Sequence, residues 1–289
     1  MHSTMADVKR IVKPHRPDSS KRDFGCLLIV GGSDVYSGAP ALAGLAALRT
    51  GCGLVVLAAP ESVAGAIRGY SPNLIVHALS GRVITTRDLD ELSSLTLSST
   101  AVVLGPGIGR DPETKDAVPK IADLAAQGKK PLLVDADAIR ALAGRQESLK
   151  RSSPVITPHA GEFRAISGID APNGWKARAP VCKKFAADHS CTLLLKGHDT
   201  VISDGRRVKV NPTGNPGMAV GGMGDVLSGI IGAFLAQGAP AFEAAVAGAY
   251  VHGLAGDIVF KRKGFHMLAS DLVEALPEAL KRHDRLLPV

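Results

Sequence analysis

The chain has 289 residues, of which 45% are hydrophobic, and a formal net charge of +7. This composition supports a large buried core and excludes a mainly disordered protein. No apolar run reaches the roughly 18 residues of a membrane-spanning helix, and the polar, basic start lacks the apolar centre of a signal peptide, so we expect a soluble, cytoplasmic protein without membrane contact. Because the aromatic content is only 4% and the basic residues are dispersed, an anionic small molecule fits the positive charge better than nucleic acid does.

The four cysteines are scattered along the sequence, at Cys26, Cys52, Cys182 and Cys191. Without a CxxC pair, this spacing supports neither a zinc site nor a thioredoxin-like motif. We therefore expect reduced thiols, most of them buried.

Short runs rich in Val, Ile and Leu recur along the chain at intervals that leave room for helices. They cover residues 26–32, 53–60, 73–79, 101–107, 131–138, 154–159 and 191–197. Continuous apolarity is typical of parallel strands covered on both faces, and the Ala- and Leu-rich segments between the runs indicate helices. The sequence thus predicts one layered helix, sheet, helix domain over residues 21–289, preceded by a loosely ordered segment of residues 1–20.

The pattern changes after Gly197. The stretch "TVISDGRRVKVNP" alternates in polarity around an Asp-Gly turn signal, which predicts a hairpin at an antiparallel edge of the sheet. Two apolar helices are expected next, over about 225–236 and 241–260, and their many small residues favour close packing of neighbouring backbones.

Polar and glycine residues follow several of the predicted strands. They are Gly31-Gly32-Ser33, Gly105-Pro106-Gly107, Asp135 and Asp137, Thr157-Pro158-His159, and Lys196-Gly197. Ligands of open parallel sheets bind beyond the carboxyl ends of the strands, so we expect these groups to line one cleft. Taken singly, the glycines can serve as turn formers, the two aspartates as caps of the next helix, His159 as a structural residue and Lys196 as a solvated charge.

A glycine-rich turn precedes the first of the two apolar helices. Gly221, Gly222 and Gly224 allow a tight bend with several amide hydrogens pointing outward at a helix start, which is an arrangement that binds phosphate. A carboxylate beside such an anion hole suits a base that removes a proton from a hydroxyl attacking the phosphate, which gives Asp225 a chemical role. The alternative is that Asp225 only caps the helix.

The phosphate donor is not bound by a P-loop, because the sequence contains no GxxxxGK[ST]. The stretch "GPGIGR" lacks the third glycine of GxGxxG at its usual spacing, so a NAD-linked hydride-transfer enzyme is weakly supported. Nucleotide-dependent phosphoryl transfer by a fold without a P-loop is better supported.

Six motifs occur in order along the chain: "GGSDVYSGAPALAGLAALRTGCGLV", "GPGIG", "DADAI", "TPHAGEF", "LLKGHDTVI" and "NPTGNPGMAVGGMGDVLSGIIGAFLAQG". This set resembles the ADP- or ATP-dependent NAD(P)H-hydrate dehydratase family, and the similarity runs from about residue 24 to residue 280. The resemblance implies a ribokinase-like, three-layer α/β/α domain with a mostly parallel central sheet and an antiparallel edge.

The resemblance also implies a repair activity. Members of the family phosphorylate the ring hydroxyl of (S)-NAD(P)H hydrate with ADP or ATP and eliminate phosphate, which regenerates NAD(P)H. Asp225 matches the base of the family, and Gly222, Met223 and Gly224 match the residues that supply backbone amides. The nucleotide contacts match Lys196, Gly197, His198, Asp199, Thr200 and Gly224. The contacts to the hydrated cofactor match Ala39, Gly107, His159 and Asp225.

Cofactors and partners follow from the same resemblance. Magnesium is expected with the nucleotide phosphates, and Glu162 is a candidate for positioning its water, although no full set of metal ligands can be assigned. A homotetramer is expected by analogy, and the NAD(P)H-hydrate epimerase is expected on another chain. The choices between ADP and ATP, and between NADH hydrate and NADPH hydrate, stay open. Two alternatives remain: a ribokinase-like kinase of a vitamin precursor of the hydroxyethylthiazole or hydroxymethylpyrimidine type, and a non-catalytic nucleotide sensor.

Overall fold

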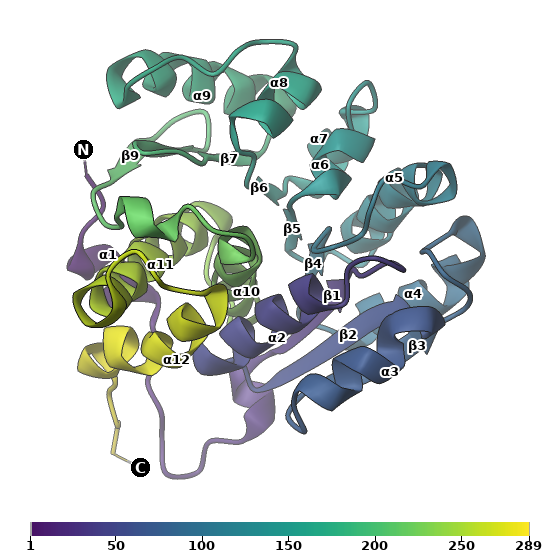
Figure 1. The fold of residues 1–289 in the computed structure, drawn as a ribbon, viewed down its shortest axis with the longest axis horizontal. Helices are drawn as coiled ribbons and strands as arrows, with labels where there is room; N and C mark the ends of the chain where they lie inside the picture. Colours follow the sequence, from purple (N-terminus) through teal and green to yellow (C-terminus); the bar gives the residue numbers. More distant parts are fainter. Residues whose placement is uncertain (1, 289) are drawn as a thin grey trace.

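A nine-stranded sheet runs through the centre of the protein, which is described here for residues 2–288 by a computed structural model (Figure 1). The strands are β1 Cys26–Val30, β2 Leu54–Pro60, β3 Ile75–Leu79, β4 Ala101–Leu104, β5 Leu132–Val134, β6 Val155–Ile156, β7 Thr192–Leu195, β8 Thr200–Ser203 and β9 Val208–Asn211. They lie in the order β3-β2-β1-β4-β5-β6-β7-β8-β9. All pairs up to β7 are parallel, and β8 and β9 extend the sheet as an antiparallel hairpin. The predicted sheet and its antiparallel edge are confirmed.

Helices cover both faces of the sheet (Figure 1). One layer holds α1 Met5–Ile11, α2 Gly38–Arg49, α3 Glu61–Tyr70, α10 Met223–Ala236, α11 Ala241–Lys263 and α12 Ala269–Leu280. The other layer holds α4 Leu89–Ser98, α5 Pro112–Gln127, α6 Asp137–Ala141, α7 Glu147–Ser152, α8 Ala160–Ser167 and α9 Trp175–His189. Within residues 2–288, no helix combines the length and apolarity needed to cross a membrane.

The sheet separates two hydrophobic cores. In β1, Leu27 and Ile29 pack into the core beneath α2 and α10, whereas Leu28 and Val30 pack into the core beneath α4 and α5. Both faces of the strand are buried, and this explains why the sequence shows continuous apolar runs rather than alternation.

The predicted elements differ from the structure at some of their ends. Helix α10 begins at Met223, two residues before the expected start, and α11 continues three residues beyond the expected end, to Lys263. The first half of the N-terminal segment, residues 1–20, contains a helix. Residues 5–11 form α1, which packs on α11 and buries Val8 completely, and the backbone N–H of Ser3 donates to the carbonyl of Val210.

The cysteines are free thiols, as expected. Cys52, Cys182 and Cys191 are buried and Cys26 is half-buried. Burial raises the pKa of the Cys191 thiol to about 12, so this group stays protonated and unreactive.

Helix α10 packs closely on α2 because a glycine lies at the contact. A Cβ atom placed on Gly229 would lie only 2.1 Å from the carbonyl oxygen of Ala43 and 2.9 Å from the Cβ of Ala46. The small residues of this helix thus allow the close backbone approach expected from the sequence.

We predict that Gly229→Ala destabilises the protein by about 1–3 kcal/mol, because the added methyl group must push α10 away from α2. Chemical denaturation measures this loss. Gly65→Ala in α3 is the matched control: a Cβ at Gly65 meets open space, so the gain in helix propensity should stabilise the protein by roughly 0.5–1 kcal/mol. Equal effects of the two substitutions would contradict the close packing.

Candidate active site

A cavity lies where the strand order of the sheet reverses. Strand β1 has β2 on one side and β4 on the other, so the connections after β1 and β4 lead away in opposite directions and leave a crevice. The cavity there has a volume of about 460 Å³. Residues 33–36 after β1, residues 108–111 after β4 and Asp137 after β5 line it.

Two predicted substrate contacts meet beside this cavity. Gly107 has a φ angle of +66°, and a Cβ atom placed on it would lie 3.0 Å from the Cβ of Ala39. The Ser33 hydroxyl donates to the Gly107 carbonyl at 2.9 Å, which ties the loop after β4 to the loop after β1. Residues far apart in the sequence therefore form one wall.

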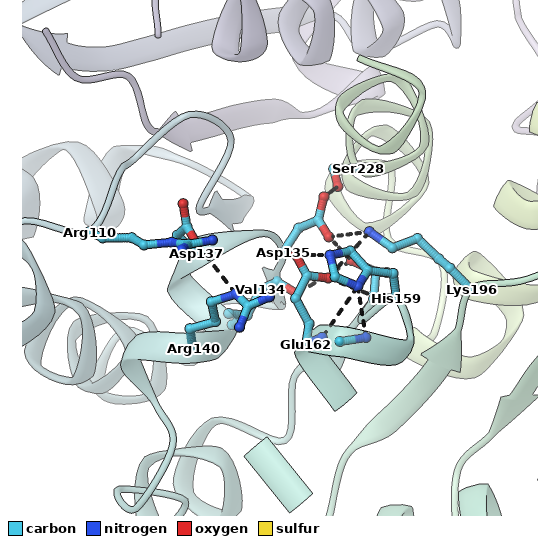
Figure 2. A network of polar contacts seen from close by, with 11 residues as sticks. Arg110, Val134, Asp135, Asp137, Arg140, His159, Glu162, Lys196 and Ser228 are labelled. Atoms are coloured by element: carbon cyan, nitrogen blue, oxygen red, sulfur yellow. Dashed lines mark hydrogen bonds and ion pairs between the residues drawn. The ribbon is translucent and has the colours of Figure 1, made fainter. Parts of the chain in front are cut away.

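Asp135, directly after β5, is the centre of a buried polar network (Figure 2). Lys196 Nζ donates to Asp135 Oδ1 at 2.9 Å, and the Thr157 hydroxyl donates to the same oxygen at 2.8 Å. The Ser228 hydroxyl of α10 donates to Oδ2 at 2.7 Å. Asp135 is 1% exposed. Burial alone would raise the pKa of this carboxyl group, but the Lys196 charge and the hydrogen bonds outweigh it and hold the pKa below its usual value.

Lys196 joins two buried carboxylates. Its Nζ lies 2.9 Å from Asp135 Oδ1 and 3.8 Å from Glu162 Oε2, and Glu162 is 5% exposed. Burial would lower the pKa of Lys196, but the two acids raise it above its ordinary value, so the ammonium group stays charged.

The glycine turn lies beside this network. Gly222 is the N-cap of α10 with a φ angle of +88°, and since it has no side chain it leaves the first amide hydrogens of the helix available to a ligand. A Cβ atom placed on Gly224 would lie 3.4 Å from Lys196 Nζ and 3.7 Å from Asp135 Oδ2. The predicted anion hole and the polar network therefore belong to one site.

Asp225 lies in the first turn of α10, three residues before Ser228, and is half-buried. Burial and the nearby charge of Asp135 raise the pKa of Asp225 to about 7, and Glu162 adds to this rise while Lys196 opposes it. A carboxylate with a pKa near neutrality is suited to accept a proton during a reaction.

His159 begins α8 as its N-cap. Its Nδ1 accepts hydrogen bonds from the backbone N–H groups of Gly161 and Glu162, at 3.0 Å and 3.3 Å. The ring proton of the neutral imidazole must then be on Nε2, which lies 3.3 Å from Glu162 Oε1. His159 is thus fixed by the helix start next to the same acid that faces Lys196.

The predicted nucleotide segment, residues 196–200, covers the turn between β7 and β8 and the first residue of β8. Thr200 closes it by donating from its hydroxyl to the Gly197 carbonyl at 3.0 Å. The carboxylate of Asp199 accepts the backbone N–H of Trp175 at 3.1 Å, whereas the side chain of His198 is 95% exposed. Arg178 of α9, which the sequence analysis did not single out, donates from Nη1 to the Asp199 carbonyl at 3.0 Å.

The two aspartates after β5 do not cap the next helix. The N-cap of α6 is Ala136, and neither aspartate side chain bonds to the first turn. Asp137 instead pairs with Arg110 at 2.7 Å and with Arg140 at 3.6 Å (Figure 2). That alternative reading of the sequence is therefore wrong, and Asp137 places charged groups at the cavity.

A comparison with family models gives one match that covers most of the chain. The model of the NAD(P)H-hydrate dehydratase family matches residues 27–278. The chain belongs to the NAD(P)H-hydrate dehydratase family.

Relatives with curated names agree with this family. The bifunctional NAD(P)H-hydrate repair enzyme Nnr of Pyrobaculum aerophilum is 46% identical over 268 residues, which are 93% of this chain and 53% of that protein. The ADP-dependent (S)-NAD(P)H-hydrate dehydratase of Cenarchaeum symbiosum is 39% identical over 97% of this chain and 96% of its own length. The chain thus spans about half the length of the bifunctional relative and nearly all of the dehydratase.

Solved structures of similar proteins share the fold. The ADP/ATP-dependent NAD(P)H-hydrate dehydratase of Bacillus subtilis, co-crystallised with ATP and Mg²⁺, has a TM-score of 0.80 and 28% identity over 98% of this chain and 100% of that chain. Hydroxyethylthiazole kinase of Pyrococcus horikoshii has a TM-score of 0.64 at 18% identity, covering 96% of this chain and 95% of the kinase, and this likeness shows the fold alone.

In this member of the NAD(P)H-hydrate dehydratase family, the described residues offer few metal ligands at the site. In the part of the chain that the structure describes, no group of three or more His, Cys, Asp and Glu side chains is arranged to hold a metal ion. Two of the acids near the anion hole, Asp135 and Glu162, face Lys196.

Proposed function

We propose that the protein is a nucleotide-dependent (S)-NAD(P)H-hydrate dehydratase, which phosphorylates the ring hydroxyl of hydrated NADH or NADPH and eliminates phosphate. The observation that carries this proposal is Asp225, a half-buried carboxyl group whose pKa is raised to about 7 in the first turn of α10. A base and an anion hole adjoin there, as phosphoryl transfer to a hydroxyl requires.

The phosphates of ADP or ATP bind at the start of α10 in this proposal. The backbone amides of Met223 and Gly224 donate to the terminal phosphate, and the positive end of the helix favours its charge. Lys196 Nζ, close to Gly224, adds a full positive charge. The rest of the nucleotide contacts the segment 196–200, including His198, Asp199 and Thr200.

The hydrated dinucleotide occupies the cavity of about 460 Å³ between the loops after β1 and β4. Ala39 and Gly107 form an uncharged wall against which the nicotinamide moiety lies. His159 presents its imidazole from the opposite side, where the polar network of Asp135, Lys196 and Glu162 lies. This placement brings the ring hydroxyl between Asp225 and the terminal phosphate.

The reaction then follows from the Asp225 carboxylate and the neighbouring amides of α10. The Asp225 carboxylate takes the proton of the ring hydroxyl while that oxygen attacks the terminal phosphorus, and the bond to the nucleotide leaving oxygen breaks. The amides of α10 stabilise the charge on the transferred phosphoryl group. Phosphate is a better leaving group than hydroxide, so the ring C–O bond breaks and phosphate departs with the oxygen of the former hydroxyl. Loss of a proton from the neighbouring ring carbon then restores the double bond of NAD(P)H.

Magnesium fits this site as an ion brought by the nucleotide. Mg²⁺ usually binds through one or two carboxylates together with phosphate oxygens and water, rather than in a cage of protein ligands. Glu162, which is 5% exposed and whose Oε2 lies 3.8 Å from Lys196 Nζ, is the carboxylate that would hold such an ion or its water. When bound, the ion supplies neutralisation of the phosphate charge.

The pH dependence of kcat/KM tests the role of the base. Asp225 must be ionised to accept a proton, and its pKa is about 7, so kcat/KM should fall as the pH drops below 7, by about tenfold per pH unit. A steady-state pH profile measures this fall. An ordinary aspartate would ionise near pH 4, so a profile that stays flat from about pH 5 to pH 8 would contradict the assignment.

A repair assay tests the function itself. Protein is incubated with hydrated NADH or NADPH, Mg²⁺, and ADP or ATP in parallel, and recovered reduced cofactor is measured. The proposal predicts recovery in step with release of phosphate. A stable phosphorylated product without recovered cofactor would indicate a vitamin-precursor type of kinase, and nucleotide binding without turnover would indicate a sensor; both results overturn the proposal.

The relatives suggest how the activity is organised. The P. aerophilum relative is a bifunctional repair enzyme, and this chain matches 53% of it. We therefore propose that this chain supplies the dehydratase step of the repair and works together with an NAD(P)H-hydrate epimerase activity. We further propose that residues 21–289 act as one catalytic domain, assembled as a homotetramer. Size measurement by light scattering tests the assembly.

A further inference from the structure

Helix α11 holds the beginning of the glycine-rich segment 213–223. The Thr213 hydroxyl donates to the Tyr250 carbonyl at 2.9 Å. About two turns further along α11, the Asp257 carboxylate accepts hydrogen bonds from the Gly214 N–H at 3.1 Å and from the Asn215 side-chain amide at 2.8 Å. The segment therefore leaves α11 from a fixed position.

The other end of the same segment is held by His252, which also lies on α11. Its Nε2 is 2.9 Å from the carbonyl oxygen of Met223, the first residue of α10. A carbonyl oxygen only accepts hydrogen bonds, so Nε2 must carry the proton. Burial, and to a smaller extent the Lys196 charge, lower the pKa of His252 to about 4 against the opposing hydrogen bond, so the imidazole is neutral at pH 7.

The bond from His252 fixes a peptide group that belongs to the anion hole. The carbonyl of Met223 and the N–H of Gly224 are parts of one planar trans peptide, and they point in opposite directions. A donor that holds the carbonyl therefore sets the direction of the Gly224 N–H toward the phosphate side. The same bond polarises the peptide and strengthens this N–H as a donor.

We propose that His252 is a positioning residue, which orients the Met223–Gly224 peptide of α10 so that its amide hydrogen meets the terminal phosphate of the nucleotide. This inference rests on the proposed function, because it assumes that the nucleotide phosphate binds at α10. It adds a residue that touches neither substrate and acts through the backbone.

Two substitutions of equal polarity separate this role from simple core packing. In His252→Gln the side-chain amide can reach the Met223 carbonyl, whereas in His252→Asn the amide is too short to do so. We expect His252→Asn to weaken ADP binding and to lower kcat, each by about tenfold, which corresponds to the loss of one hydrogen bond of roughly 1.4 kcal/mol. His252→Gln should stay within about threefold of the natural protein.

The measurements are calorimetric ADP titration, steady-state kcat and KM for both substrates, and thermal unfolding. The KM for the hydrated cofactor should not change, because the bond acts only on the phosphate side. His266→Asn, an exposed histidine in the turn after α11, is the matched control and should change nothing. Equal ADP affinity and kcat in His252→Asn, His252→Gln and the natural protein would overturn the inference, as would equal losses in the two variants.

Failure of the proposed function would look different. In that case the natural protein itself would not bind ADP or would not recover reduced cofactor. If ADP binds and turnover occurs in the natural protein, the comparison of the Asn and Gln variants decides the role of His252 alone. Because both variants introduce an uncharged amide, any loss of stability should be similar in the two, and thermal unfolding measures it.

Discussion

Asp225→Asn is expected to lower kcat by about 10²–10⁴-fold, because the amide cannot take the proton of the attacking hydroxyl. The dissociation constant for ADP should change only a few-fold, since the amides of α10 and Lys196 stay in place. Single-turnover kinetics and calorimetric titration measure the two quantities. The control is Asp90→Asn, the same chemical change at an exposed position of α4, which should leave both unchanged.

The same substitution should increase stability. The folded-state pKa of Asp225 is raised to about 7, so the folded protein holds this proton more tightly than the unfolded chain does. The raised pKa therefore costs stability, and this cost grows as the pH rises from the unfolded pKa to the folded pKa and is complete above pH 7. Removing it should raise the free energy of unfolding at pH 8 by about 1–2 kcal/mol. A loss of stability in Asp225→Asn would argue that the residue serves only as a structural part of α10.

Lys196→Met is expected to destabilise the protein by about 3 kcal/mol and to abolish measurable turnover. The substitution leaves Asp135, which is 1% exposed, as a buried carboxylate without its cation. It also removes the positive charge beside Gly224 that would bind phosphate. Urea denaturation and the repair assay measure the two effects.

Lys184→Met provides the control for this effect. Lys184 pairs with Asp188 at 2.8 Å on the exposed face of α9, so its loss should cost less than about 1 kcal/mol. Similar losses of stability in the two variants would show that the Lys196–Asp135 pair contributes no more than an exposed ion pair does.

The sheet and its cleft could be predicted because their signals are local. Most of the parallel strands are apolar runs, and a glycine or a polar residue follows them, as in Asp135 after β5 and Lys196 after β7. The carboxyl ends of parallel strands meet at one edge, so the clustering followed from the strand assignment. The glycines before Asp225 likewise indicated an anion hole from their spacing alone.

The partners inside the site could not be predicted, because they are far apart in the sequence. Asp135 and Lys196 are 61 positions apart, and Asp135 and Ser228 are 93 apart. Register decides these contacts, since Val134 aligns with Ile156 and Ile156 aligns with Leu193. Without knowledge of the strand register, Asp135 was equally suited to cap α6.

Two residues missed by the sequence analysis carried a weak signal. Ser228 is a hydroxyl within the apolar run of α10, three residues after Asp225, and His252 is a single histidine within the small apolar residues of α11. A polar side chain in a buried helix needs a hydrogen-bond partner, so each position marks a contact with another element. Arg178 gave no such signal, because charged residues are common along α9.

The structure of Asp225→Asn bound to Mg²⁺, ADP and hydrated NADH tests the central claim most directly, because this variant should bind both substrates without consuming them. The account predicts that the side chain of residue 225 lies within about 2.6–3.2 Å of the ring hydroxyl, and that the first amides of α10 donate to the terminal phosphate. A terminal phosphate bound away from α10, or a ring hydroxyl that meets a different acid or base, would contradict it.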